Sequence, residues 1–86
     1  MDIFAAGVIL FVMYAGMFPF EKAIPANKHY RKIKDGKMNQ FWKSKKLMPS
    51  DHLNDLFTKM VAHNPDERLK VDQIFSHDWV KGSISQ

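Results

Sequence analysis

The chain has 86 residues, of which 45% are hydrophobic and 26% are charged, and its net charge is +4 at pH 7. This length suits one small domain or a part of a larger one, and the composition excludes a wholly disordered chain. The absence of cysteine excludes a disulfide scaffold, cysteine-ligated zinc and iron–sulfur clusters.

The first predicted element is an apolar helix over residues 3–15. Residues 3–20 carry no charged side chain; Asp2 is a good N-cap, Gly16 suits the position just past the helix, and Pro19 prevents continuation. A secretory signal is disfavoured, because the chain starts with an acidic instead of a basic residue. The helix would be about 20 Å long, shorter than the ~30 Å hydrocarbon layer of a membrane. A helix that is apolar all round must be buried, so we expect it at the centre of something larger than this chain.

A second helix is predicted over residues 28–35, with Asn27 as its N-cap and Gly36 as its stop. Glycine suits the stop because it adopts the left-handed conformation without steric cost. Tyr30 and Ile33 would face inward from this helix.

Residues 37–49 are expected to form a loop that holds the adjacent aromatic residues Phe41 and Trp42. Ser50 then caps the clearest amphipathic helix, which ends just before Pro65, since the residue preceding a proline avoids the α region. The apolar positions of that helix follow helical spacing and are Leu53, Leu56, Phe57, Met60 and Val61.

A final short helix over residues 71–76 would bury Ile74 and Phe75, with Trp79 just past its end. No strand-like alternation and no internal repeat occurs in the sequence. The predicted fold class is therefore all-α, with about four helices around a buried apolar first helix.

Four motifs carry a resemblance to a known family. The chain reads DIFAAGVILF at residues 2–11, GMFPF at 16–20, NPDER at 64–68 and QIFSHDW at 73–79. These resemble D-x-W-S-x-G-V-I-L-Y, G-x-x-P-F, D-P-x-x-R and E-I-L-x-H-x-W of protein kinases. In this order they make the chain similar to the C-terminal part, helices F to I, of a Ser/Thr protein kinase domain. The ending most resembles the calcium/calmodulin-dependent and calcium-dependent kinases.

The resemblance implies a partial kinase domain, the C-terminal helical subdomain of the C-lobe, over residues 1–80 and a short tail at residues 81–86. By analogy with the family, Asp2 would bond backbone amides of the catalytic loop, and Arg68 would pair with the glutamate of the Ala-Pro-Glu motif. In this chain alone, a simple N-cap and a surface base remain the alternatives for these two residues. The positions that match structural positions of the family are Asp2, Gly7, Gly16, Pro19, Phe20, Trp42, Pro65, Arg68, His77 and Trp79.

The chain departs from the family pattern at three places. Phe4 and Ala5 replace tryptophan and serine, and Lys70 stands where serine or threonine usually caps the last helix, which weakens that cap. Val12 occupies a position where some kinases carry a glutamate that reads a substrate arginine. Substrate preference therefore stays open.

The groups that perform phosphoryl transfer do not occur in this sequence: there is no G-x-G-x-x-G loop, V-A-I-K lysine, catalytic-loop aspartate or Asp-Phe-Gly motif. We therefore predict no catalytic, cofactor-binding or metal-binding residue, and assign ATP and Mg²⁺ only to an intact parent enzyme. The four histidines also lack metal-ligand spacing; they are His29, His52, His63 and His77. We expect the chain to be inactive alone.

The resemblance implies a structural and peptide-docking part of a cytoplasmic Ser/Thr kinase, whose partners would be the missing upstream segment and the parent's protein or peptide substrate. No nucleic acid or membrane partner is expected.

Two alternatives stay open. Residues 22–46 carry nine Lys and Arg against Asp35 alone, which suits a basic module that binds an acidic partner or nucleic acid. Residues 3–20 could also form a single-span membrane peptide. If residues 3–15 are a core helix of a larger lobe, the chain alone leaves apolar surface uncovered.

Overall fold

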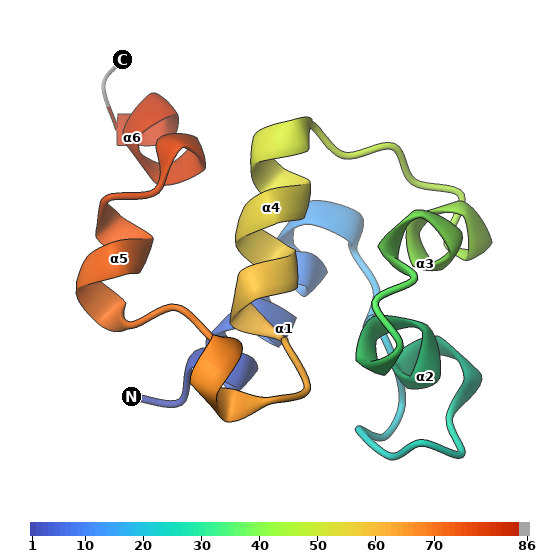
Figure 1. Cartoon of the computed structure of the whole chain (residues 1–86). Helices are drawn as coiled ribbons and strands as arrows, with labels where there is room; N and C mark the ends of the chain where they lie inside the picture. Colours follow the sequence, from blue (N-terminus) through green and yellow to red (C-terminus); the bar gives the residue numbers. More distant parts are fainter. Residues whose placement is uncertain (85–86) are drawn as a thin grey trace.

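A computed structural model describes residues 1–84, and within this range every regular element is a helix (Figure 1). The elements in chain order are α1 (Ile3–Ala15), α2 (Lys28–Lys34), α3 (Met38–Ser44), α4 (Asp51–Met60), the 3-10 turn η1 (Pro65–Glu67), α5 (Val71–Phe75) and α6 (Asp78–Ile84). The predicted all-α fold class is confirmed.

Helix α1 has the predicted bounds because both of its ends are capped as expected. The Asp2 carboxylate accepts a hydrogen bond from the backbone N–H of Ala5 at 3.0 Å. At the other end, Gly16 adopts a left-handed φ of 72° and its N–H donates to the carbonyl of Val12 at 2.8 Å.

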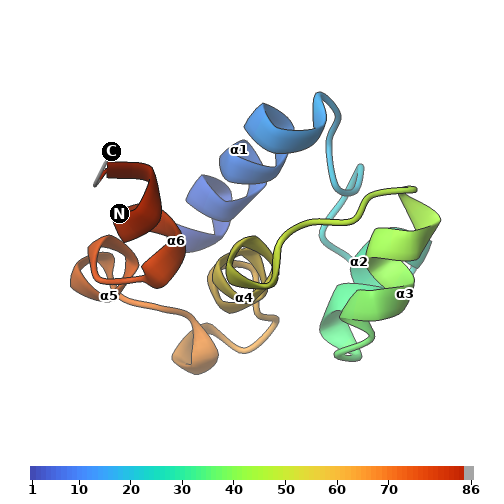
Figure 2. The same cartoon turned by 90° about the horizontal axis from the view of Figure 1, so that it is seen from above.

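Helices α1 and α4 form the centre of the molecule, with α2 and α3 on one side and α5 and α6 on the other (Figure 2). Gly7 allows α1 to approach α4 closely. A Cβ atom at this position would lie 2.7 Å from Cγ1 of Val61 and 2.9 Å from Cβ of Met60, distances that real Cβ atoms do not reach. The small residue therefore sets the separation of the two central helices.

The core is an aromatic cluster between α1, α3 and α4. Phe11 on α1 is 1% exposed, and its ring centroid lies 5.2 to 5.6 Å from those of Phe41, Trp42 and Phe57. The other buried members of this cluster are Ile33, Met38 and Val61. Tyr30 and the apolar positions of α4 are also buried, as predicted.

The predicted loop over residues 37–49 is wrong for its first half, which forms helix α3. Met38, Phe41 and Trp42 have the i, i+3, i+4 spacing of a helix face, and all three side chains are buried. Lys37, at the N-cap position, makes no side-chain cap. The helix is therefore held by its apolar face instead of by a capping residue.

Helix α2 begins after the predicted cap: the Asn27 side chain accepts from the backbone N–H groups of His29 and Tyr30. It ends at Lys34, one residue earlier than predicted, and Gly36 follows with a φ of 75°. Ser50 caps α4 as predicted.

The C-terminal part of the prediction needs three corrections. Helix α4 ends at Met60, earlier than the approach to Pro65, so that a short turn precedes η1. Phe75 is 66% exposed instead of buried, and Ile74 is only half-buried. The five residues of α5 make little more than one helical turn, so the helix cannot turn both side chains towards its neighbours. Trp79 lies on a further helix, α6, and not past the last one. Of the expected tail, residues 81–84 continue α6, while residues 85–86 lie outside the described residues.

Helix α1 is apolar all round but covered on one side only. Ile9 is 60% exposed and Met13 79% exposed, and Phe18 in the following loop is 69% exposed. The expectation of uncovered apolar surface is confirmed at these positions. Within residues 1–84, none of the helices is both long and apolar enough to cross a membrane.

Candidate docking site at the start of the first helix

Asp2 and Arg68, which are far apart in the sequence, line the same hollow beside the start of α1. This hollow, which we call the α1 hollow, has a volume of about 390 Å³ and is lined by Asp2, Phe4, Ala23, Tyr30, His63 and Arg68. A second hollow of about 670 Å³ shares Asp2 and Arg68 and extends along η1 towards Val71. The two charged side chains thus stand between two concave surfaces.

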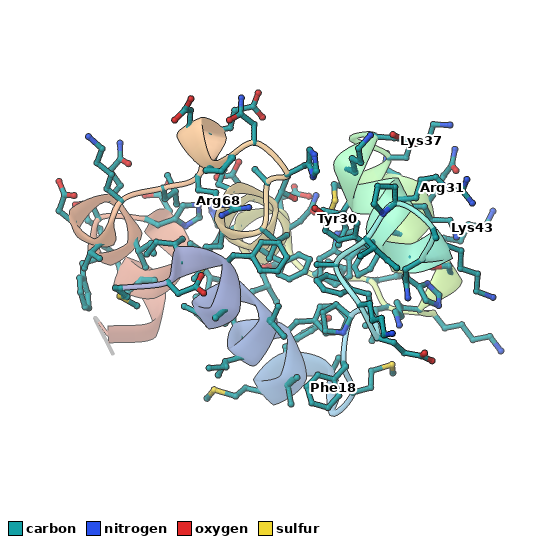
Figure 3. The ribbon with its side chains drawn as sticks, turned by 90° about the horizontal axis from the view of Figure 1, so that it is seen from below. Phe18, Tyr30, Arg31, Lys37, Lys43 and Arg68 are labelled. Atoms are coloured by element: carbon teal, nitrogen blue, oxygen red, sulfur yellow. The ribbon has the colours of Figure 1, made fainter. Side chains whose placement is uncertain are left out.

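Arg68 is held in place by backbone oxygens and an aromatic ring. Its Nε donates to the carbonyl of Ala62 at 2.7 Å, Nη2 donates to that of His63 at 3.4 Å, and the guanidinium carbon lies 4.9 Å from the ring centroid of Phe4. The side chain is half-buried, so it is not a simple surface base (Figure 3). Because a guanidinium has five N–H donors, three of them are left for a further acceptor.

Asp2 likewise has spare hydrogen-bonding capacity. One carboxylate oxygen caps α1 at Ala5, and among residues 1–84 the other oxygen has no hydrogen-bond partner. No acidic group of the described residues lies within 4.0 Å of the Arg68 guanidinium. The α1 hollow therefore presents a carboxylate that can accept N–H donors and a guanidinium that can bind a carboxylate.

An aromatic wall closes one side of the α1 hollow. The ring centroids of Phe4 and Phe20 are 5.8 Å apart, and those of Phe20 and Tyr30 are 5.3 Å apart. The Tyr30 hydroxyl and Nδ1 of His63 are joined by a hydrogen bond of 2.6 Å. Sequence reasoning did not predict Phe4, Tyr30 and His63 as lining residues. One signal was present for Phe4, because this chain has phenylalanine where the family motif has tryptophan.

The other predicted family positions lie elsewhere and support the fold. Gly7 and Gly16 serve the helix crossing and the α1 C-cap, and Pro19 is fully buried in the loop that follows. Trp42 belongs to the aromatic core, and Pro65 is the first residue of η1. Of the predicted positions, Asp2 and Arg68 line the α1 hollow, Phe20 packs against two of its lining rings, and Pro65 lines the neighbouring hollow with Asp2 and Arg68.

His77 ties the last helix to α4, far from the α1 hollow. Its Nε2 lies 2.7 Å from Oδ2 of Asp55, and its Nδ1 accepts from the backbone N–H of Trp79 at 3.1 Å, which caps α6. Asp55 also pairs with Lys59 at 3.0 Å. Partial burial raises the pKa of Asp55, but the hydrogen bonds from His77 and Lys59 lower it further, so the pKa lies below its ordinary value.

Lys70 gives α5 no side-chain cap, as its residue type predicted. Its backbone N–H instead donates to the Gln73 side chain at 2.8 Å, which is one half of a capping box.

The part of the chain that the structure describes contains no group of three or more histidine, aspartate or glutamate side chains placed to hold a metal ion.

Comparison with known proteins identifies one family. Residues 1–80 match the protein kinase domain. Calcium-dependent protein kinase 12 of Arabidopsis thaliana is 36% identical over 81 residues, which cover 92% of this chain and 16% of that protein. CBL-interacting serine/threonine-protein kinase 13 of the same plant is 42% identical over 81 residues, with coverages of 93% and 15%. CBL-interacting protein kinase 29 of Oryza sativa subsp. japonica is 35% identical over 85 residues, with coverages of 98% and 18%. The chain spans less than a fifth of the length of these relatives.

Proposed function

This chain belongs to the protein kinase domain family, and on that premise we propose that it serves as the C-terminal helical part of a Ser/Thr kinase domain. In this role it holds the part of the domain that carries the catalytic residues and takes no chemical step itself. The phosphorylation of a protein substrate, with ATP and Mg²⁺, belongs to the assembled enzyme. A cytoplasmic location is part of the same proposal, and the absence of cysteine from the chain suits it.

The observation that carries this proposal is that Asp2 and Arg68 both line the α1 hollow without bonding to each other. By family analogy Asp2 accepts backbone N–H donors of the catalytic loop and Arg68 binds the glutamate of the Ala-Pro-Glu motif. Each has the required hydrogen bonds unused, and the two lie on one concave surface. A single incoming segment can therefore engage both.

The uncovered side of α1 supports the same proposal. Ile9 and Met13 are one helical turn apart, and both are mostly exposed. A large apolar surface on a small chain is typical of an interface with another segment. In the proposed assembly, the upstream part of the kinase domain covers this side of α1.

The test is reconstitution from two polypeptides. The 86-residue chain is mixed with a separately produced polypeptide that carries the rest of the kinase domain of calcium-dependent protein kinase 12. We expect stable association and phosphorylation of a serine peptide by the mixture, and no phosphorylation by the chain alone. Binding of Mg-ATP to the 86-residue chain at micromolar concentration would contradict the proposal.

Two variants test whether the association of the two polypeptides depends on the α1 hollow. Asp2→Asn keeps an N-cap of similar strength but loses the negative charge, and Arg68→Lys keeps the charge but loses the bidentate geometry. Each should weaken association at least about tenfold, because Asp2→Asn removes one charge of a desolvated contact and Arg68→Lys removes one of its two parallel hydrogen bonds. Arg31→Ala, which removes an exposed arginine that does not line the α1 hollow, is the matched control and should have no effect.

A further inference from the structure

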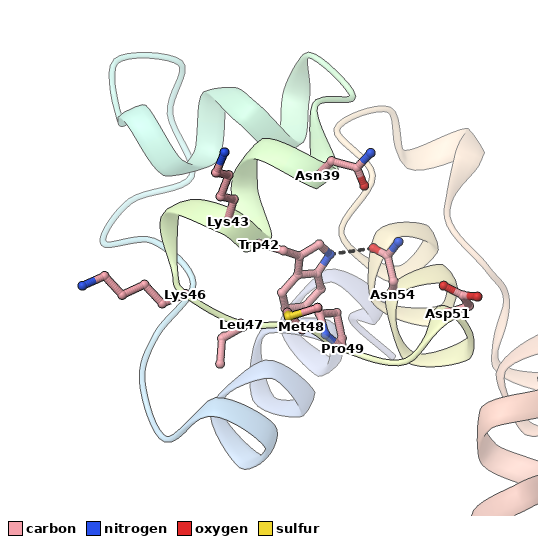
Figure 4. Close-up of a pocket in the computed structure, with 9 residues that line it drawn as sticks. All are labelled: Asn39, Trp42, Lys43, Lys46, Leu47, Met48, Pro49, Asp51 and Asn54. Carbon is pink, nitrogen blue, oxygen red and sulfur yellow. Dashed lines mark hydrogen bonds between the residues drawn. The ribbon is translucent and has the colours of Figure 1, made fainter.

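A third concave surface lies between α3 and α4, and it shares no lining residue with the α1 hollow. It has a volume of about 480 Å³, within the range of ligand pockets. Its lining residues come from α3, from the connection that follows, and from the first turn of α4 (Figure 4). We call it the α3–α4 hollow.

The apolar part of the α3–α4 hollow is formed by Trp42, Leu47, Met48 and Pro49. Trp42 is 5% exposed and is held by a 2.6 Å hydrogen bond from its Nε1 to Oδ1 of Asn54. Met48 is 94% exposed, so its flexible thioether side chain is free to close over an apolar group. One side of the hollow is therefore fixed by the hydrogen-bonded Trp42, whereas Met48 can change its conformation to contact a bound group.

The polar part has hydrogen-bond donors on both the α3 and the α4 side. Asn54 Oδ1 accepts from Trp42 and, at 3.2 Å, from Thr58, so its amide NH₂ group can donate to a ligand. Lys43 and Lys46 stand on the α3 side of the hollow, and Asp51 stands on the α4 side (Figure 4). Asp51 lies in the first turn of α4, where the helix dipole stabilises a negative charge.

The surroundings of the α3 side are strongly basic. Arg31, Lys37 and Lys43 point outward from α2 and α3 (Figure 3), and no ion pair within residues 1–84 neutralises them. Burial lowers the pKa of Lys45, and the nearby charges of Lys28 and Lys32 lower it too, against the opposing effect of Glu21. Lys28, Lys32 and Lys45 therefore lie close enough to repel one another, although none of them lines the hollow. Together with Lys43 and Lys46 they give this side of the chain a positive potential that attracts an anionic partner.

We propose that the α3–α4 hollow docks an acidic peptide segment that carries one apolar anchor side chain. The anchor lies on Leu47 and Pro49, under Met48 and beside the small exposed part of Trp42. The carboxylates on the α3 side of the anchor meet Lys43 and Lys46. Asn54 donates to a backbone carbonyl of the segment. This inference stands independently of the proposed function, since it uses neither Asp2 nor Arg68.

A peptide fits this surface better than a nucleic acid does. Single-stranded nucleic acids bind by stacking bases on exposed aromatic faces, whereas the only aromatic residue lining this hollow, Trp42, is almost fully buried. A peptide can instead bind through one apolar side chain next to Leu47 and Pro49. Its acidic side chains then lie towards Lys43 and Lys46, on the opposite side of the hollow from Asp51 (Figure 4).

The experiment uses the 86-residue chain and a fluorescein-labelled heptapeptide, Asp-Asp-Glu-Phe-Glu-Asp-Asp, in a polarisation assay at low salt. Two further peptides, one with alanine in place of phenylalanine and one with lysine in place of every acidic residue, separate the anchor from the charges. An oligodeoxythymidylate of similar charge is the nucleic-acid competitor. The emission of Trp42, read in a Trp79→Phe background, reports whether ligand reaches the hollow.

We expect the acidic peptide to bind and to change the Trp42 emission, and Lys43→Glu with Lys46→Glu to weaken binding about tenfold or more. The matched control, Lys34→Glu with Lys37→Glu, makes the same change in net charge on residues outside the hollow and should weaken binding far less. Met48→Ala, at an exposed position that cannot unfold the chain, should weaken the phenylalanine peptide but leave the weaker alanine peptide unchanged.

Three results would overturn the proposal. The two pairs of lysine variants could weaken binding equally, which would show only a diffuse charge effect. The alanine peptide could bind as tightly as the phenylalanine peptide, which would remove the anchor. The oligonucleotide could bind more tightly than the acidic peptide, and the basic face would then be a nucleic-acid surface.

Discussion

The two sides of α4 are built from helices of similar length but are held together by different forces. On one side, α3 contributes three buried apolar side chains in only seven residues and packs them against Phe11 and Phe57. On the other side, α5 contributes no buried side chain, and Phe75 faces solvent. Burial of a large side chain contributes about 1.5–3 kcal/mol, so the aromatic side dominates the stability of the fold.

Hydrogen bonds hold the C-terminal side instead. The backbone N–H of Leu69 donates to the carbonyl of Lys59 at 3.0 Å, and His77 bonds to Asp55. A net contribution of about 1 kcal/mol for each such bond is smaller than that of a buried aromatic ring. We therefore expect the α5–α6 side to open at a lower free energy than the aromatic side.

The largest effect is expected when one aromatic ring is removed from each side of α4, which compares how strongly the two sides stabilise the fold. Phe11→Ala should cost about 3–5 kcal/mol, because it leaves a cavity at the centre of the aromatic cluster. Phe75→Ala should change the free energy of unfolding by less than about 0.5 kcal/mol, because that ring is mostly exposed. Urea titration followed by circular dichroism measures both. Similar costs for the two variants would show that α5 packs in solution.

The second test compares two glycines. Gly7→Ala should destabilise the chain by about 1–3 kcal/mol, since the new Cβ would overlap Val61 and Met60 and push α1 away from α4. Gly82→Ala on α6 meets no atom within 4 Å and should be neutral or slightly stabilising, as alanine is the better helix former. Thermal unfolding of both variants gives the comparison; a stable Gly7→Ala protein would mean that the helix crossing is loose.

A smaller effect is expected for His77→Ala, at about 1–2 kcal/mol, because it removes the α6 cap and the bond to Asp55. The loss should be local. Hydrogen exchange should speed up in α5 and α6 and stay unchanged at the amides of α3 and α4. Faster exchange throughout residues 1–84 would contradict the separation of the two sides.

The pH dependence of the C-terminal side follows from Asp55, whose pKa in the folded chain is below its ordinary value of 3.8. The folded state therefore binds this proton less readily than the unfolded state does. The stabilisation is present above that ordinary value and is lost as the pH falls through the folded pKa. The protection factors of the α6 amides, which are corrected for the intrinsic exchange rate at each pH, should fall on acidification below about pH 4, and Asp55→Asn should remove this part of the acid response. An unchanged acid response in that variant would assign it to other carboxylates.

The smallest change in stability is expected for the exposed side of α1. Ile9→Glu with Met13→Lys should alter the free energy of unfolding by less than about 0.5 kcal/mol, because both side chains are mostly exposed and the new charges form an i, i+4 pair. Binding of a hydrophobic dye and self-association in sedimentation should nevertheless fall sharply. A parent chain that is monomeric and binds no dye would contradict the existence of an open interface on α1.

Local chemistry was enough to predict the helices that begin at a side-chain cap. Asp2, Asn27 and Ser50 each accept a hydrogen bond from a backbone N–H two or three residues further on. Such contacts depend only on neighbouring residues, so they can be read from the sequence. The apolar spacing of α4 predicted its buried side for the same reason, since one helix determines its own periodicity.

Helix α3 was missed because its stability comes from other parts of the chain. Lys37 provides no cap, and a seven-residue helix is unstable in isolation; Met38, Phe41 and Trp42 become its buried face only when α1 and α4 are in place. The wrong assignment of Phe75 has the opposite cause. An apolar residue on a five-residue helix has no preferred direction until packing decides whether anything covers it.

For the candidate site too, some features could be predicted from the sequence and others depended on the packing of the helices. The motifs in the sequence pointed to Asp2 and Arg68 separately, each through its own short pattern. That they line one hollow, and that Phe4 and two backbone carbonyls fix the Arg68 guanidinium there, was decided by the packing of α1 against α4 and the path of the chain through η1. A contact between positions separated by most of the chain depends on every element between them, whereas a cap depends on three residues.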